Sequence, residues 1–202
     1  TNPDLTAKLA DQRYRRNRFA EAGELCDAVL EKHPEHPLAA IVKARLLTRA
    51  QKLREAQTLL EAAQKAHPDE PRLLLALARN YTEAKNYTAA AKLLEHGRKV
   101  APLDGDWLEQ LARIYAATGD ETLSISVLEE VTASDPDELD GRIRLAKAYL
   151  AANRPGDAAR VARDAIRIDV TSEAARSVLL KTLSVLGHDE EVSKLTRRFS
   201  GK

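Results

Sequence analysis

The chain has 202 residues, of which 44% are hydrophobic, 31% are charged and only 4% are aromatic. Its net charge of +1 excludes a globally basic or acidic protein, so an electrostatic partner has to be sought in local charge patterns. The longest apolar runs, such as residues 73–77, are too short to span a bilayer, which argues against membrane insertion. The chain begins Thr1-Asn2-Pro3 and contains no methionine, so we expect a processed form or an excised fragment. No signal peptide is visible, and the compartment of the expected soluble protein, cytoplasmic or periplasmic, stays open.

Prolines mark a fixed period along the chain. Pro34, Pro68, Pro102 and Pro136 stand 34 residues apart, and a fifth step lands on Val170 in a segment that otherwise copies the others. A period of this size indicates one supersecondary unit repeated in tandem. The sequence therefore predicts an elongated stack of similar units.

Each period holds two sets of apolar residues and alanines, separated by a polar pair such as Asn17-Arg18 or Gly119-Asp120. Within a set the spacings are three and four residues, which places the set on one face of a helix. The proline ends the second helix because it lacks the amide hydrogen and crowds the preceding turn. We expect no strands and six helix pairs: 4–16 with 20–33, 37–50 with 53–66, 71–84 with 87–100, 105–117 with 121–133, 139–152 with 155–168, and 173–185 with 189–199.

The residues at fixed places in the period resemble the signature of the tetratricopeptide repeat family over essentially the whole chain. The third period shows this most fully, with Leu77, Ala78, Tyr81, Ala90 and Pro102. The resemblance implies an all-α, right-handed solenoid of about six antiparallel helix pairs. It implies a single array over residues 1–202, with repeats at about 3–36, 37–70, 71–104, 105–138, 139–172 and 173–202.

The resemblance also implies that the first helices line a concave groove, which family members usually use to bind a peptide or a partner's helix. Pentatricopeptide repeats, which read RNA, have a period of 35 residues, and the unbroken period of 34 argues against them. We therefore expect a protein or peptide partner and no nucleic acid.

The last predicted helix has a narrow apolar face of Val192, Leu195 and Phe199, flanked by charges. An end helix needs apolar contacts on one side only. We interpret it as a polar cap, which favours an array complete at six repeats and a monomer or a weak homo-oligomer.

One position of the first helices carries a cation in five consecutive repeats. These residues, which we call the cationic ladder, are Arg45, Arg79, Arg113, Lys147 and Lys181. The equivalent residue of the first repeat is Asp11. In the family this position faces the groove, where asparagine is common. Neighbouring first helices should lie about 10 Å apart, so the ladder would span roughly 40 Å.

Two interpretations of the ladder stay open. Arginines could grip carboxylates or phosphates of a bound segment in a bidentate way. Alternatively, nearby acids neutralise it: Glu109 is one turn before Arg113, and Asp106 and Asp140 are near the starts of their helices. Repulsion between neighbours is only about 0.4 kcal/mol in water, so the ladder alone does not prove selection for binding.

Family members that grip a chaperone's C-terminal carboxylate need lysine at a fixed groove position. This chain instead has Ala7, Ile41, Leu75, Glu109, Ile143 and Ser177 there. A chaperone-tail adaptor is therefore not expected. Ile41 and Leu75, with Thr48 and Thr82, suggest a partly apolar groove in the N-terminal half, which would suit an amphipathic acidic ligand.

The other candidate residues favour structural roles. His33 and His36 invite a zinc interpretation, but His33 and His67 are equivalent positions at helix ends, where imidazole is a routine cap. We expect Trp107 to pack between repeats and Cys26, which has no partner for a disulfide, to be a small buried hydrophobe. The sequence shows no nucleophile–base constellation, glycine-rich phosphate loop or paired-carboxylate site, so we expect neither catalysis nor a cofactor.

The sequence thus predicts a non-catalytic scaffold that binds an acidic or amphipathic peptide or helix in its groove. Its candidate binding residues are the cationic ladder with Ile41, Leu75 and Thr82. An alternative stays open: the chain is a module of a larger protein whose activity lies elsewhere. The family resemblance allows this, because bacterial chains often append such arrays to peptidases, secretion factors or cell-envelope machinery.

Overall fold

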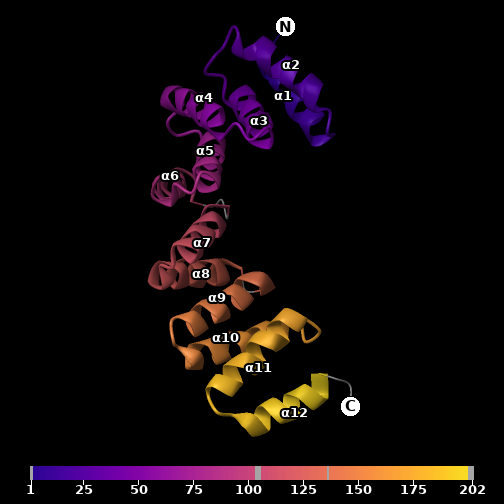
Figure 1. Ribbon diagram of the computed structural model, residues 1–202, viewed down its shortest axis with the longest axis vertical. Helices are drawn as coiled ribbons and strands as arrows, with labels where there is room; N and C mark the ends of the chain where they lie inside the picture. Colours follow the sequence, from indigo (N-terminus) through magenta and orange to yellow (C-terminus); the bar gives the residue numbers. More distant parts are fainter. Residues whose placement is uncertain (1, 103–105, 136, 200–202) are drawn as a thin grey trace. The chain divides into compact units, whose positions relative to one another are not determined.

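The computed structural model describes residues 2–102, 106–135 and 137–199, and over these residues its only regular elements are helices joined by short turns (Figure 1). The helices are α1 (Pro3–Arg15), α2 (Phe19–Leu30), α3 (Pro37–Arg49), α4 (Leu53–Ala66), α5 (Pro71–Glu83), α6 (Tyr87–Val100), α7 (Asp106–Thr118), α8 (Glu121–Ser134), α9 (Leu139–Ala151), α10 (Pro155–Ile168), α11 (Glu173–Val185) and α12 (Asp189–Phe199). The predicted all-α solenoid of helix pairs is confirmed.

The predicted helix boundaries agree with these bounds to within about three residues. α1, α3 and α5 each begin at a proline, Pro3, Pro37 and Pro71, because a proline at the first helical position has its φ preset and needs no partner for a missing amide hydrogen. α2 ends at Leu30, three residues before its predicted end. Pro136 and the predicted first residue of the seventh helix, 105, lie outside the described residues.

The turn inside each helix pair uses the same backbone device. One residue per turn has a left-handed φ between 55° and 74°, and these residues are Asn17, Gln51, Lys85, Gly119, Asn153 and Gly187, spaced 34 apart. The next amide donates to the carbonyl five residues back, as from Asn86 to Tyr81 (2.8 Å). This bond closes the first helix as a Schellman cap. The polar pairs of the sequence are therefore the helix caps that fold each repeat into a hairpin.

The chain divides into two compact units, Thr1–Trp107 and Leu108–Lys202. In the first unit α3 contacts α1 and α5, while α2 packs on α1 and α3 and α4 packs on α3 and α5. In the second unit α9 contacts α11, α8 packs on α9, and α10 packs on α9 and α11. Within each unit, therefore, first helices lie against first helices, and a second helix fills the space between its own first helix and the next.

Each second helix presents one residue to one residue of the next first helix, and we call these two positions the junction pair. Large residues lie opposite small ones in four of the pairs. The pairs are Val29 with Ala39, Ala63 with Leu73, Gly97 with Trp107 and Val131 with Gly141, and the equivalent positions of α10 and α11 are the buried Ala165 and Ala175. A small residue opposite a large one lets the two helices pack closely without overlap of the side chains.

The pair of Gly97 and Trp107 is the most asymmetric. The Trp107 side chain is fully buried, and its indole N–H donates to the carbonyl of Ala101 (2.9 Å). A Cβ atom added at Gly97 would overlap the Trp107 ring. The prediction that Trp107 packs between repeats is confirmed, and so is the burial of Cys26, whose exposure is 0%.

The Gly97 junction gives a direct test of size matching. Gly97→Ala should destabilise the first unit by about 1–3 kcal/mol, because the indole has to move to admit the methyl group. The double variant Gly97→Ala with Trp107→Leu should regain much of this loss, because it copies the pair of Ala63 and Leu73. Urea unfolding followed by circular dichroism measures both effects.

Gly156→Ala is the matched control. Gly156 lies in α10 with open space around it, so alanine there should be neutral or stabilise by up to about 1 kcal/mol. Equal stability of Gly97→Ala and the parent protein would contradict size matching at this junction.

Candidate functional site

All five side chains of the cationic ladder are exposed to solvent on first helices. Arg45 on α3 and Arg79 on α5 belong to the first unit, where these helices contact each other. Arg113 on α7, Lys147 on α9 and Lys181 on α11 belong to the second, where α9 contacts α11. Within each unit the ladder residues therefore occupy equivalent places on neighbouring helices.

In the first unit, Asp11 of α1 partly neutralises the ladder. Its carboxylate lies 3.2 Å from a guanidinium nitrogen of Arg45 and 2.8 Å from Nε of Arg15, four residues along its own helix. The Arg45 guanidinium also lies 6.0 Å from the centre of the Tyr14 ring. Asp11 and Arg45 hold the same position in consecutive repeats. This ion pair therefore joins the ladder position of α1 to that of α3.

In the second unit, Glu109 has the same role. Arg113 donates to its carboxylate from the same helix (3.0 Å), as the neutralising interpretation expects, and Arg144 of α9 reaches it as well (2.5 Å). Partial burial opposes the ionisation of Glu109, but the hydrogen bonds and charges of Arg144 and Arg113 outweigh this and lower its pKa. Asp140 lies 4.0 Å from Arg144 and not beside a ladder residue, and the Asp106 side chain lies outside the described residues.

Lys147 and Lys181 differ from Arg45 and Arg113. Both lysines are exposed, and neither forms an ion pair with any residue that the structure describes. Their ammonium groups therefore remain available to an incoming anion. The neutralising interpretation thus applies to Arg45 and Arg113 and not to these two lysines.

The residues predicted to form the apolar part of the groove expose little of their surface to solvent. Ile41 is 3% exposed and belongs to a core cluster with Leu60 and Leu73, and Leu75 is 9% exposed. Thr82 is half-buried, and its hydroxyl donates to the carbonyl of Ala78 (2.9 Å). Contact of these residues with a ligand stays a prediction, and their burial limits it to the edges of the side chains.

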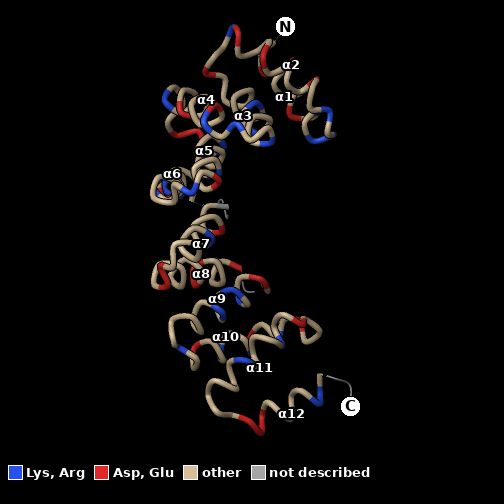
Figure 2. The backbone as a smooth tube through the Cα atoms, viewed as in Figure 1, with Lys and Arg blue, Asp and Glu red and all other residues tan. Residues whose placement is uncertain are grey.

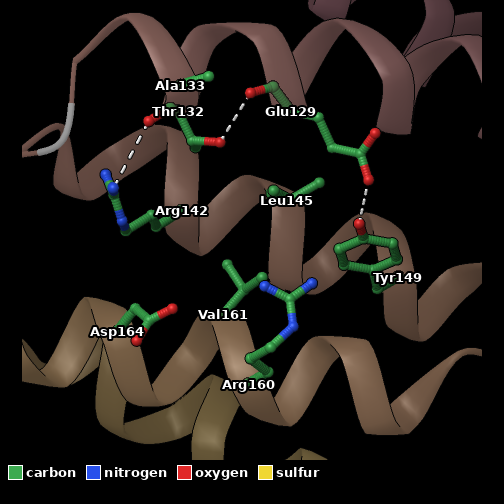
Figure 3. Close-up of a pocket in the computed structure, with 9 residues that line it drawn as sticks. All are labelled: Glu129, Thr132, Ala133, Arg142, Leu145, Tyr149, Arg160, Val161 and Asp164. Atoms are coloured by element: carbon green, nitrogen blue, oxygen red, sulfur yellow. Dashed lines mark hydrogen bonds between the residues drawn. The ribbon is translucent and has the colours of Figure 1, made fainter.

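A pocket of about 290 Å³ lies between α8, α9 and α10 (Figure 3). Its polar lining combines Glu129, Arg142, Arg160 and Asp164, so positive and negative groups are balanced. With about 100° of rotation per helical residue, the pocket-lining residues of α9 lie on the opposite side from Lys147. The pocket is therefore separate from the ladder, and no motif of the sequence predicted it.

A tyrosine–glutamate hydrogen bond recurs between repeats. Tyr81 of α5 donates to Glu61 of α4 (2.6 Å), and Tyr149 of α9 donates to Glu129 of α8, 68 residues further on in both cases. The bond from Tyr81 lowers the pKa of Glu61. Burial and the same bond raise the pKa of Tyr81 to about 12. These two signature tyrosines thus hold α5 to α4 and α9 to α8.

Comparison with protein families decides the identity of the fold. The family model for the N-terminal TPR repeats region of Psidin matches residues 15–122, which is more than half of the chain, and a tetratricopeptide repeat model matches residues 116–200. The chain belongs to the tetratricopeptide repeat family. Repeats of this family are generally non-catalytic protein-interaction modules.

Solved structures of tetratricopeptide proteins share this fold at low sequence identity. The chain is 14% identical to MamA with a TM-score of 0.73, covering 84% of this chain and 92% of MamA. It is 14% identical to YrrB, described as a TPR protein with an unusual peptide-binding site, with a TM-score of 0.68 and coverages of 83% and 86%. A structure of Naa15/Naa10 bound to HypK-THB aligns at 16% identity with a TM-score of 0.66, covering 98% of this chain and 36% of that chain. No curated protein matches the sequence.

The described residues of this tetratricopeptide array were also compared with what a metal site, a membrane span and a reactive thiol require, and they meet none of these requirements. Within the described part of the chain, no three histidine, cysteine or acidic side chains gather where they could share a metal ion. None of the described helices is both long and apolar enough to cross a membrane. Burial raises the pKa of the Cys26 thiol to about 12, so this thiol stays protonated at neutral pH.

The tyrosine–glutamate bond predicts a pH-dependent stability. Tyr81→Phe should destabilise the protein by about 1 kcal/mol at neutral pH. Because the folded state lowers the pKa of Glu61, this contribution is present above the ordinary glutamate pKa of 4.5 and disappears as the pH falls below it. Unfolding curves at neutral pH and at acid pH measure the change.

Tyr87→Phe serves as the control, because its hydroxyl has no hydrogen-bond partner among the described residues. Tyr87→Phe should leave stability unchanged at both pH values. A Tyr81→Phe effect that is the same at both would show that the bond to Glu61 is not its source.

Proposed function

We propose that this scaffold binds an acidic or amphipathic segment of a partner protein along the exposed face of its first helices. The observation that carries the proposal is the ladder itself, five exposed cations at one position of consecutive first helices. Within this ladder, Lys147 and Lys181 lack a carboxylate partner among the described residues. A carboxylate of a bound ligand would therefore gain the most electrostatic attraction at these two lysines.

The paired rungs support the same function differently. Asp11 and Glu109 fix the guanidinium groups of Arg45 and Arg113 without covering them, because these arginine side chains are 42% and 64% exposed. A guanidinium held in place loses less freedom when it donates a second pair of hydrogen bonds to a bound carboxylate. We expect the arginines to orient a ligand and the lysines to add most of the electrostatic attraction.

The comparison with YrrB is compatible with this proposal, since that protein is described as having a peptide-binding site on the same fold. At 14% identity the similarity extends to the fold alone. The acidity of the partner rests on the charges of this chain. Figure 2 shows that lysines and arginines are distributed over the helices of both units, while acidic residues prevail on α8 and just after it.

The double variant Lys147→Glu with Lys181→Glu tests the ladder. A fluorescent acidic amphipathic peptide should bind the variant about tenfold or more weakly than the parent, because two attractive charges become repulsive. Anisotropy titrations at about 50 and 200 mM salt should show an affinity that falls with salt, because the attraction comes from exposed charges, but less steeply than that of a polyanion such as RNA.

The matched control is Lys194→Glu with Arg198→Glu on α12. These residues are exposed, form no ion pair within the described residues, and give the same change of net charge. If both double variants bind the peptide equally, the ladder is not its binding site.

A further inference from the structure

The turns that join the two helices of each repeat differ in charge along the chain. Residues 13–21 carry four arginines and one acid, and the equivalent residues 47–55 carry three cations and one acid. The equivalent residues of the third and fifth repeats are balanced in charge, and those of the fourth and sixth carry acids and no lysine or arginine. Positive charge is therefore concentrated at the first two turns, and in Figure 2 the turn between α1 and α2 is mostly blue.

Six exposed cations at these two turns form a surface that we call the basic edge. They are Arg15, Arg16, Arg18, Arg49, Lys52 and Arg54. The two turns lie side by side, because the Arg49 guanidinium at the end of α3 lies 4.3 Å from the centre of the Phe19 ring at the start of α2. The basic edge lies at helix ends and not on the faces that form the junctions, so a further repeat packed on α1 would leave it exposed.

The acids beside the basic edge are shared between cations. Asp11 pairs with Arg15 (2.8 Å) and also with the ladder residue of α3. Glu21 likewise pairs with both Arg18 (2.5 Å) and Arg13 (3.3 Å). Each carboxylate thus faces two guanidinium groups, and one positive charge of each group of three is left uncompensated.

Three residues of the basic edge have no carboxylate partner. Arg16, Arg49 and Arg54 form no ion pair with any residue that the structure describes, whereas Lys52 pairs with Glu55 (2.9 Å). A guanidinium that lies over an aromatic ring still donates in its own plane, so the N–H groups of Arg49 stay free. These three side chains are therefore available to an incoming anion.

Helix stability does not explain the cations of the basic edge. α2 and α4 have Arg18 and Lys52 at their N-caps, and neither side chain forms a cap hydrogen bond. A cation at the start of a helix lies against the positive end of the helix dipole and offers no acceptor to the free amides. At the same position of the third and fourth repeats, Asn86 and Asp120 do accept an amide of their helix. The first two repeats therefore carry a cation where a cap would stabilise the helix more.

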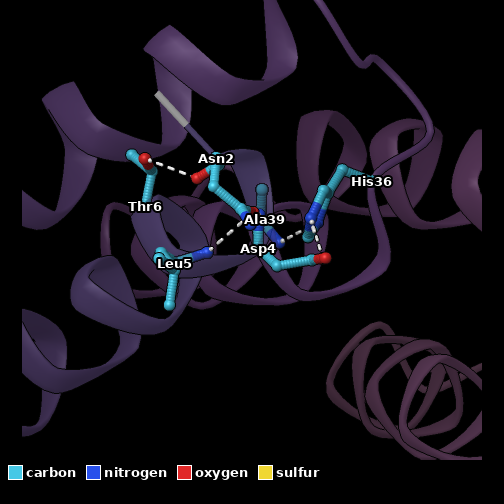
Figure 4. Close-up of polar contacts among 6 residues, drawn as sticks. All are labelled: Asn2, Asp4, Leu5, Thr6, His36 and Ala39. Atoms are coloured by element: carbon cyan, nitrogen blue, oxygen red, sulfur yellow. Dashed lines mark hydrogen bonds and ion pairs between the residues drawn. The ribbon is translucent and has the colours of Figure 1, made fainter.

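The starts of the first helices in the same unit are capped. Asn2 accepts from the amides of Asp4 (2.9 Å) and Leu5 (3.4 Å) at the start of α1 (Figure 4). Asp4 lies 3.0 Å from Nε2 of His36, whose Nδ1 accepts from the amide of Ala39 at the start of α3. The polar groups at this end of α1 and α3 are matched with one another, and the basic edge lies at the opposite end of these helices.

The residue types of the basic edge favour phosphate as the anion. Five of its six cations are arginines, whose planar fork donates two parallel hydrogen bonds to one phosphate group. The side chains of Arg15 and Arg18 are 74% and 50% exposed, so they project into solvent. Such a protruding edge suits a flat surface with many phosphates better than a small ligand that has to be enclosed.

The aromatic residues of this edge disfavour a nucleic acid. Proteins that bind single strands stack the bases on open aromatic faces. Here Arg49 lies over the Phe19 ring, Tyr14 packs against the same ring with 5.4 Å between the ring centres, and Arg45 lies 6.0 Å from the centre of the Tyr14 ring. Both rings are therefore already engaged by neighbouring side chains. A bilayer surface needs only charge density, and a cluster of about four to eight cations is typical of proteins that bind anionic lipids.

We propose that the basic edge attaches the first unit to an anionic membrane surface, through contact of its arginines with lipid phosphate groups and without insertion into the bilayer. Each cation near an anionic leaflet adds to the attraction. The proposed peptide face depends most on Lys147 and Lys181 of the second unit. The two proposals thus use different residues, and either can fail without the other.

Vesicles test this attachment. The full chain is mixed with vesicles of phosphatidylcholine containing about 30% phosphatidylglycerol, whose only charge is its phosphate group, and with vesicles of phosphatidylcholine alone. Sedimentation should show saturable binding to the anionic vesicles only, and this binding should weaken as salt rises from about 50 to 200 mM. Arg16→Glu with Arg54→Glu should weaken it about tenfold or more, because one unpaired cation of each turn becomes a repulsive charge.

The matched control is again Lys194→Glu with Arg198→Glu. These exposed residues of α12 give the same change of net charge and form no ion pair within the described residues. Because they lie outside the basic edge, this variant should bind the anionic vesicles as the parent does. Circular dichroism checks that each variant remains folded.

Several outcomes would overturn the proposal. No binding to the anionic vesicles, or equal binding to both kinds of vesicle, would show that the edge does not recognise an anionic membrane. Equal loss in the two double variants would assign the binding to net charge and not to the basic edge. A single-stranded oligouridylate that binds more tightly than the vesicles at the same salt, and loses this binding in Arg16→Glu with Arg54→Glu, would assign the edge to nucleic acid.

Discussion

Each repeat can bury the apolar side of its first helix only by packing it against the second helix of the repeat before it. This junction is the contact on which the rest of the structure depends, because a single helix pair has no core of its own. The residues that meet there are matched in size, as Ala63 is to Leu73 and Gly97 to Trp107. Matching lets the same backbone spacing recur while the side chains differ.

Polar groups contribute to this structure, but its stability depends on the apolar junctions. The left-handed residue of each turn closes its hairpin by a backbone bond, so the shape of a repeat is set locally. Exposed ion pairs such as Arg18 with Glu21 contribute little to stability. Because the core rests on apolar junctions, the outward positions of the first helices can carry cations at little structural cost. This leaves the ladder available for binding.

The sequence predicted the helices and their order well because the period places equivalent residues at equivalent points, and proline and the polar pairs mark the ends. It also predicted the burial of Trp107 and the pairing of Glu109 with Arg113, which are contacts within one helix or at one repeat position. It did not reveal that Arg144 also reaches Glu109 or that Asp11 holds Arg45. Such contacts depend on how far neighbouring helices are rotated, and periodicity fixes only the repeat, not that rotation. The sequence did not reveal the burial of Ile41 for the same reason.

Size matching at the junctions also restricts how such a chain can change during evolution. Tandem repeats with one backbone are expected to be gained, lost and exchanged readily by recombination. Here the loss of residues 71–104 would bring Trp107 against Ala63, and the loss of residues 37–70 would bring Leu73 against Val29. Each event would need a compensating substitution at the new boundary. The repeats therefore share a backbone shape but cannot exchange positions freely. Their order along the chain is constrained by the sizes of the residues that meet at each junction.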